Sequence, residues 1–330
     1  MRKWLAELLS GLPGRRHALV RAAPTQVHAA PAGAHAQHSV AQFPAPSLPA
    51  DLSAPFVEWQ QGGAASRETP MGPRELRALR HLDALLAEDR TPADLLPRTP
   101  AVVPQLLNLL RQDNLPLAAV CERVGKDVVL TAEVLRLGNT AHYRQRAGHA
   151  VADLSQAIAA LGNDGVQRAI ARVVLKPLYD GQGGVLSSRA AAPLWKHGEH
   201  KATLCAALAA QRGIEPFEGY LAGLMHNAGW SIAWRAFDRM DGGVSVPFSH
   251  AFVQQLVLRK DRLFGKAAAA WQISTTLNAL GADILADGLE PARSPLAAAL
   301  ALADRDATIA MLAPTVTVDL NASQLLQPAA

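Results

Sequence analysis

The sequence lacks several features that would place it in other classes of protein. It has no run of eighteen or more apolar residues, so no membrane-spanning segment is predicted. Its two cysteines, Cys121 and Cys205, have no CxxC partner, which argues against a disulfide or structural zinc site and is typical of free thiols in a reducing cytoplasm. Aromatic residues make up only 5% of the chain, and alternating β-branched runs are absent before the last twenty residues. The expected secondary structure is therefore helix.

Alanine and leucine, in contrast, are abundant. Apolar residues form 49% of the 330 residues, enough to build one large domain or two ordinary ones. The formal net charge is only +4. Binding to nucleic acid is not expected, because few aromatic side chains accompany the basic residues of the first helical region, which are Arg123, Lys126, Arg136, Arg144 and Arg146.

The N-terminal 72 residues differ in composition from the rest. The first nine residues imitate a signal peptide, but Glu7 and Gly11 interrupt the apolar stretch, and a short amphipathic helix is predicted instead. Residues 22–73 are rich in Ala, Pro, Gly, Ser and Gln, which predicts a disordered tail. An alternative use of residues 1–21 is weak peripheral contact with a membrane, through the apolar side chains Trp4, Leu5, Leu8 and Leu9.

Apolar residues then recur with helical spacing almost to the C-terminus. Leucines from Leu76 to Leu86 predict a leading helix within residues 73–94. Two helices are expected around Gly162, which can close the first in a left-handed conformation while Asn163 or Asp164 caps the second. Further helices are predicted at 102–110, 117–124, 128–137, 190–211, 215–237, 250–263, 267–280 and 296–312, and residues 314–330 are expected to form a tail.

Five short strings, in order, resemble the HDOD domain family. They are Leu-Pro-Arg-Thr-Pro at 96–100, Leu-Thr-Ala-Glu-Val-Leu-Arg-Leu-Gly-Asn-Thr-Ala at 130–141, Ala-Ile-Ala-Ala-Leu-Gly at 157–162, Leu-Trp-Lys-His at 194–197, and Gly-Leu-Met-His-Asn-Ala-Gly at 223–229. Five ordered matches are far more specific than any one of them alone. The resemblance covers roughly residues 95–290.

The resemblance implies an all-α fold in two lobes: an N-terminal helical bundle and a lobe related to HD-type phosphohydrolases, after a disordered N-terminal tail. It places the HDOD-like domain at 95–290 and leaves a C-terminal helix at 291–313. Proteins of this family are generally described as bacterial signalling or regulatory proteins without an established shared reaction. The motif positions expected to have structural roles are Pro97, Pro100, Asn139, Gly162, Gly223 and Gly229.

Catalysis is not expected, because the HD-type motif is incomplete. That motif supplies a histidine, a His-Asp pair and a further Asp or His, which hold a divalent ion that activates water. Here the positions are His197 and the pair His226-Asn227, and a neutral amide oxygen is a weaker ligand than a carboxylate. No histidine follows His250, Lys266 to Ala270 fills the stretch where the motif would place another ligand, and Asp283 and Asp287 are the only candidates to replace it. No metal or other cofactor is predicted; any metal would be held by His197 and His226.

A degenerate pocket is predicted instead, formed by Trp195, His197, His200, His226 and Asn227. Its side chains either pack a helix end with their polar atoms satisfied by neighbouring backbone, or bind a small polar or anionic ligand. Asn139 is interpreted as a helix cap that tolerates a left-handed backbone, with a place at the interface between the lobes as the alternative.

The predicted function is that of a non-catalytic, cytoplasmic regulatory protein in bacterial signal transduction, acting by binding an unidentified protein partner or a small ligand. One alternative is a divergent metal-dependent phosphohydrolase acting on a nucleotide or cyclic dinucleotide. The other is a membrane-peripheral adaptor that uses residues 1–21.

Overall fold

The computed structural model describes residues 51–63, 66–88, 95, 120–121, 124–126, 128–140, 151, 153–181 and 183–313. Several predictions lie outside these residues. They are the amphipathic helix and membrane contact at 1–21, the helix at 102–110 and most of that at 117–124, the motif residues Pro97 and Pro100, and the tail at 314–330.

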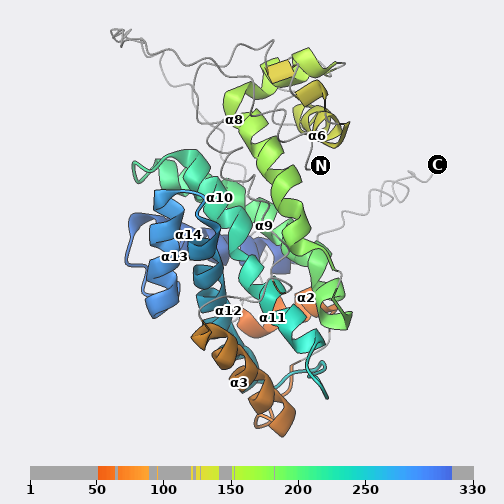
Figure 1. The fold of residues 1–330 in the computed structure, drawn as a ribbon, viewed down its shortest axis with the longest axis vertical. Coiled ribbons are helices and arrows are strands. Elements are labelled where there is room, and N and C mark those ends of the chain that lie inside the picture. Colours follow the sequence, from red (N-terminus) through yellow and green to blue (C-terminus); the bar gives the residue numbers. More distant parts are fainter. Residues whose placement is uncertain are drawn as a thin grey trace, which may run out of the picture. The chain divides into compact units, whose positions relative to one another are not determined.

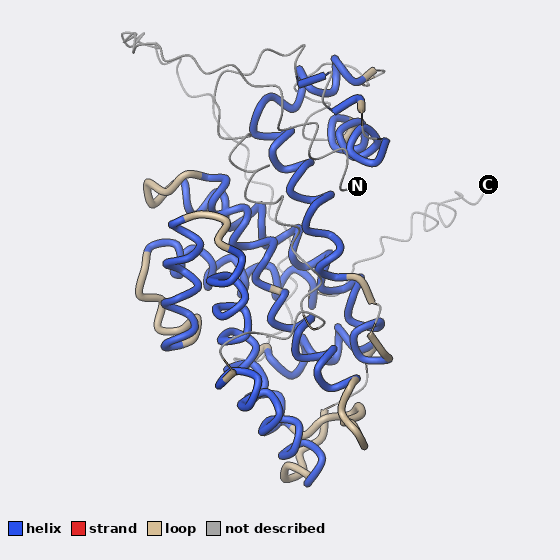
Figure 2. The backbone as a smooth tube through the Cα atoms, viewed as in Figure 1, coloured by secondary structure: helices blue, strands red, loops and turns tan. Residues whose placement is uncertain are grey.

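The regular elements of the described residues are all helices (Figures 1 and 2), which confirms the all-α prediction. The one extended pairing within them is an isolated parallel bridge between Arg67 and Ser249. Of the helices in these ranges, none is both long and apolar enough to cross a bilayer.

In the N-terminal lobe, helix α6 (Val128–Gly138) packs against α8 (Leu154–Leu175). Gly138 permits this packing, because a Cβ atom there would lie 3.3 Å from the backbone of Ala157. Asn139 follows α6, and its side-chain amide donates to the carbonyls of Leu135 at 3.0 Å and Val151 at 3.1 Å. Asn139 therefore does cap the helix end, but it does so without adopting a left-handed backbone, since its φ is not positive.

Helix α8 is kinked at Gly162, where φ is 65° and ψ is −175°. The predicted break with positive φ is thus present at this residue. Asp164, one of the two predicted caps, forms a salt bridge of 2.9 Å with Arg168 one turn later. Its carboxylate thus pairs with another side chain on the surface of the same helix.

After the short 3-10 turn η1 (Lys176–Tyr179), the described residues of the second lobe form six helices. They are α9 (Val185–Ala210), α10 (Pro216–His226), α11 (Ala228–Asp238), α12 (His250–Trp271), α13 (Thr275–Asp287) and α14 (Pro295–Leu312). Helix α9 contacts α10, α11 and α14, and α12 packs along α13 and α11 (Figure 1).

Two predicted helix boundaries are wrong. The helix expected at 215–237 is divided at Asn227, and the break expected between 263 and 267 does not exist. Gly265 lies within α12 and does not end a helix. A Cβ atom there would be 2.6 Å from the carbonyl oxygen of Gly281, so glycine at this position allows the two helices to pack closely.

Gly223 and Gly229 serve the same purpose around the break at Asn227. A Cβ atom on Gly223 would lie 2.6 Å from Cα of Ala202, and one on Gly229 would lie 2.0 Å from the carbonyl oxygen of Lys260. These two glycines bring α10 against α9 and α11 against α12. The resulting close approach draws polar side chains of α9, α10 and α12 into one small volume.

The prediction that residues 1–72 are a disordered tail is wrong for their last part. Residues Ser53–Gln61 form helix α2, which packs on α9, α12 and α14. Phe56 and Val57 are buried in this contact, and Gln60 accepts a hydrogen bond of 2.9 Å from Nε1 of Trp234. Helix α3 (Pro73–Ala87) begins where the leucine pattern predicted and packs on α12.

Candidate functional site

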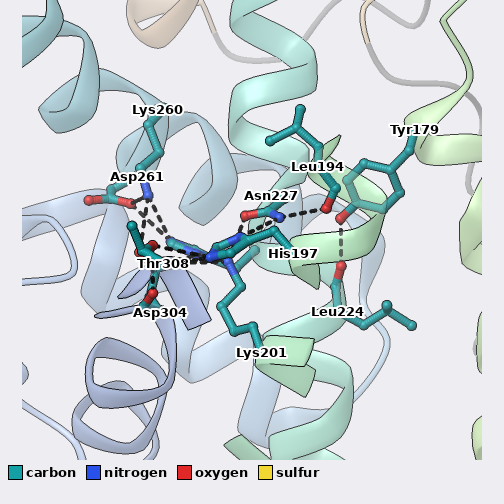
Figure 3. A network of polar contacts seen from close by, with 11 residues as sticks. Tyr179, Leu194, His197, Lys201, Leu224, Asn227, Lys260, Asp261, Asp304 and Thr308 are labelled. Atoms are coloured by element: carbon teal, nitrogen blue, oxygen red, sulfur yellow. Dashed lines mark hydrogen bonds and ion pairs between the residues drawn. The ribbon is translucent and has the colours of Figure 1, made fainter. Parts of the chain in front are cut away.

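A cluster of charged and polar side chains lies buried between four helices of the second lobe (Figure 3). We call it the buried charge cluster. Helix α9 contributes two members one turn apart, α10 ends in a third, a fourth lies between α10 and α11, and α12 and α14 add two each. Its members are His197, Lys201, His226, Asn227, Lys260, Asp261, Asp304 and Thr308.

Lys201 is at the centre of the cluster. Its Nζ atom lies 2.9 Å from Nδ1 of His226, 2.6 Å from Oδ1 of Asn227 and 2.7 Å from Oδ1 of Asp304. An ammonium group has three protons to donate, and here each proton has an acceptor on α10, at its end or on α14. The ammonium therefore joins α9 to both segments with its hydrogen-bonding capacity filled.

Asn227 fits this place as an amide and not as a carboxylate. Its Nδ2 atom donates to the carbonyl of Leu194 at 2.8 Å and to Nδ1 of His197 at 3.0 Å, while its oxygen accepts from Lys201. An aspartate could supply neither of the two donated hydrogen bonds. These partners also assign the His197 tautomer: Nδ1 accepts, so Nε2 carries the proton and donates to Oγ1 of Thr308 at 3.2 Å.

His226 is held by one group on each side. Its Nδ1 atom accepts from Lys201, so Nε2 carries a proton, which it donates to Oδ1 of Asp261 at 2.9 Å. The same carboxylate lies 2.7 Å from Nζ of Lys260, which is 3.9 Å from Oδ2 of Asp304. The cluster therefore combines two ammonium groups with two carboxylates.

The electrostatics of the cluster support this pairing. Burial lowers the pKa of Lys201 to about 8, although Asp304 opposes the shift. At Lys260, attraction to Asp261 and Asp304 outweighs the effect of burial, so the pKa is raised. Burial opposes ionisation of Asp304, but Lys201 and Lys260 hold its pKa well below the usual value. Burial, with repulsion from Lys201, lowers the pKa of His197 to about 3. At neutral pH His197 is uncharged, and the carboxylates and ammonium groups balance.

Aromatic side chains and helix packing close the cluster. The ring of Phe56 packs on His197 at a centroid distance of 4.6 Å, and Phe264 contacts His226 edge-on at 5.1 Å. His197, Lys201, His226 and Asn227 have no exposed surface, whereas the side chain of Asp304 is 24% exposed. Solvent thus reaches the cluster at its α14 edge and not at its centre.

The structure brings together three of the five predicted pocket residues: His197, His226 and Asn227 are in one network. His200 is exposed on the flank of α9, so its predicted place in the pocket is wrong. Trp195 is also outside the network, because it lies on another face of α9, 5.6 Å from the ring of Tyr179 and 5.5 Å from the guanidinium of Arg172.

The prediction that Asp283 and Asp287 are the only carboxylates able to replace the missing ligand is also wrong. Asp261 and Asp304 supply the carboxylates, whereas the candidate replacements do not: Asp287 is exposed and pairs with Arg293 at 3.1 Å, and Asp283 is half-buried on α13. A sequence signal for Asp304 did exist. It is a charged residue beside the apolar stripe of Leu300, Ala303 and Ala307 on α14.

The residues present do not fit the divalent ion that HD-type relatives hold. The atoms that would be its ligands, on His226, Asn227 and Asp304, converge on Nζ of Lys201. In the described part of the chain, no group of three or more His, Cys, Asp and Glu residues is arranged to hold a metal. The site is filled by an amino acid side chain.

The other face of α9 borders an open groove of about 790 Å³, which lies between α6, α8, α9 and α10. Arg172 in its wall forms ion pairs with Glu133 and Glu199, and Arg168 lies 5.2 Å from the ring centroid of Tyr220. Burial raises the pKa of Glu199. Other lining residues are Leu137, Asn163, Asp164, Gln167, Thr203, Ala206, Ala207, Ala210, Glu215 and Pro216.

Comparisons with known proteins agree with the motifs. The model of the HDOD domain family matches residues 96–245. An HDOD domain protein of unknown function from Geobacter sulfurreducens has a similar structure, with a TM-score of 0.51, 22% identity, and coverage of 72% of this chain and 79% of that one. At this identity the likeness shows the fold alone. A search of curated proteins finds no match.

Two further solved structures are less similar. One, from Shewanella amazonensis SB2B, is named provisionally as a metal-dependent phosphohydrolase; it has a TM-score of 0.49 and 17% identity over 70% of this chain and 82% of that one. The other, from Marinobacter aquaeolei VT8, is named provisionally as a signal transduction protein; it has a TM-score of 0.45 and 19% identity over 73% of this chain and 57% of that one.

Proposed function

The chain carries an HDOD domain at residues 96–245, and from this premise we propose that it is a non-catalytic signal-transduction protein that acts by binding. The observation that carries the proposal is the closure of the buried charge cluster. Lys201 fills the centre, and His197, Lys201, His226 and Asn227 are all completely buried. Metal-assisted hydrolysis needs an ion and a water molecule beside the substrate, and here the ammonium group of Lys201 contacts the atoms that would bind the ion.

Turnover and metal content of the full-length protein test this function. We expect no hydrolysis of phosphomonoesters, phosphodiesters or cyclic dinucleotides with added Mn²⁺, and no stoichiometric metal in the purified protein. Stoichiometric metal that is lost in His226→Ala, together with turnover that is lost in His197→Ala, would contradict the proposal.

Binding is proposed to use the groove on the outer face of α9 instead of the predicted pocket. Its volume of about 790 Å³ is within the range of small-molecule sites. Two arginines face three acidic residues along its walls, and alanines of α9 form an apolar floor. This lining favours a small ligand with an apolar part and both donor and acceptor groups over a polyanion, so the proposed ligand is polar but not strongly anionic.

A pair of matched variants tests the groove. Ala207 lines the groove and Ala192 is exposed elsewhere on α9. A panel of nucleosides, amino acids and other polar metabolites is screened by thermal shift against the wild-type protein. Any compound that raises Tm should lose this effect in Ala207→Trp and keep it in Ala192→Trp; loss in neither variant would place the ligand elsewhere.

The second candidate function remains a divergent metal-dependent phosphohydrolase. One observation favours it: two carboxylates, Asp261 and Asp304, lie beside His226, so anionic ligands are present after all. For an ion to enter, Lys201 would have to leave its three acceptors. The turnover assay above decides between the two functions.

A further inference from the structure

We infer that the ammonium group of Lys201 is a resident cation, which takes the position of a divalent ion among its would-be ligands and replaces it. This role rests on the proposed function, because it accounts for an HD-like core that is kept without an ion. One lysine side chain stands where the HD-type motif would hold an ion. The atoms that would bind the ion are still in place around it.

Two of the acceptors around Lys201 are spaced like two ligands of a metal ion. Nδ1 of His226 and Oδ1 of Asp304 are 3.4 Å apart. Two ligands of a tetrahedral zinc ion, each about 2.1 Å from the metal, are separated by about 3.4 Å. Both atoms, and Oδ1 of Asn227, are within 2.9 Å of Nζ. The ammonium thus occupies the common focus of one nitrogen and two oxygen ligands.

Charge balance explains why lysine and asparagine occur together. In the HD-type pair that this sequence resembles, an aspartate stands at the position of Asn227. A dication facing that aspartate sums to one positive charge, and the ammonium of Lys201 facing the neutral amide of Asn227 sums to the same value. The change at one position compensates the change at the other.

Lysine and a divalent ion exclude one another at this site. The two ammonium groups of the cluster, on Lys201 and Lys260, are balanced by the carboxylates of Asp261 and Asp304. A dication entering beside Lys201 would add two uncompensated charges in a volume shielded from water, which is strongly unfavourable. Removal of the lysine side chain both opens space and leaves one negative charge in excess.

The Lys201→Ala variant of the full chain tests this role. We expect a lower Tm than the wild type without metal, and a rise of about 5 °C or more when excess Zn²⁺ or Mn²⁺ is added. Metal analysis after gel filtration should find about one ion per chain, as four-coordinate sites hold a single ion. The wild type should show neither effect. Lys201→Ala/Asn227→Asp should bind the ion more tightly, and Lys201→Ala/Asp304→Asn should not bind it.

Two results of this experiment bear on the resident-cation role. The role is overturned if Lys201→Ala keeps its helical circular dichroism but takes up no more metal than the Lys201→Ala/Asp304→Asn control. A variant that folds only when Zn²⁺ is supplied supports it. Metal and turnover in the wild type, by contrast, would overturn the proposed function itself, so the two failures are distinguishable.

A second variant covers the case in which Lys201→Ala does not fold at all. Lys201→Met keeps most of the buried stem and removes only the charge, so Asp304 loses its nearer ammonium at 2.7 Å and keeps only that of Lys260 at 3.9 Å. Adding Asp304→Asn to Lys201→Met should then raise Tm. If Lys201→Met is as stable as the wild type and the second substitution has no effect, the ammonium is not a resident cation.

Discussion

The two faces of helix α9 carry similar chemistry in opposite settings. On the inner face, Lys201 is completely buried and its ammonium is bonded on three sides. On the outer face, Glu199 pairs with Arg172 at the wall of an open groove, and its side chain is 27% exposed. Ionic groups on the inner face fix the fold, whereas those on the outer face remain within reach of solvent and of a ligand.

This difference shows that the resemblance located the closed face and not the open one. The motif histidines of HD-type enzymes mark the inner face, which here has become part of the core. The groove has no such motif, because its lining comes from separate positions on four helices that form no continuous string in the sequence. The proposed function therefore rests on the open outer face of α9 and not on the motif residues of the inner face.

The largest effect is expected from removing the central charge of the inner face. Lys201→Met removes the nearer of the two ammonium groups beside Asp304 and leaves only that of Lys260, 3.9 Å away, and loss of one member of a buried ion pair typically costs about 3–5 kcal/mol. Chemical denaturation measures the free energy of unfolding. The matched control is Lys196→Met, an exposed lysine on the same helix, for which a change below about 0.5 kcal/mol is expected. Equal effects of the two variants would remove the distinction between the faces.

A smaller but still large effect is expected from restoring the HD pair alone. In Asn227→Asp the carboxylate cannot donate to Leu194 or to His197, and these unmade hydrogen bonds outweigh stronger attraction to Lys201. We expect the free energy of unfolding to fall by about 2 kcal/mol. The loss should be smaller at low pH, where the protonated carboxyl can donate one hydrogen bond. Asn163→Asp, at an exposed position of α8, is the control. A stabilised Asn227→Asp protein would show that the amide is not required there.

The inner face should also give the protein an acid-dependent stability. The folded-state pKa of His197 is lowered to about 3, so His197 stays neutral down to that pH while the unfolded chain binds a proton below about 6.5. The unfolded state then holds more protons, and the free energy of unfolding falls with decreasing pH, by about 2 kcal/mol between pH 6.5 and 5. His197→Gln should flatten this slope, whereas His200→Gln, exposed on α9, should leave it unchanged.

Sequence patterns predicted the elements of the fold better than the contents of the site. Leucine spacing located α3, and the motif strings brought His197, His226 and Asn227 to one place. Asp304 was missed because it lies on a helix beyond the span of the resemblance, about a hundred residues from His197. Lys201 was missed because a lysine on a helix is usually exposed, and only tertiary packing reveals that this one is buried.

The smallest effect is expected on the outer face, and it bears most directly on binding. Burial raises the pKa of Glu199, so its ionised form is already disfavoured, and Glu199→Gln should change the free energy of unfolding by about 0.5 kcal/mol or less. Because Glu199 lines the groove, the same variant should nevertheless weaken binding of any ligand found there. Thermal shift with and without ligand measures both quantities. Unchanged affinity together with a large loss of stability would mean that the outer face, like the inner one, serves the fold.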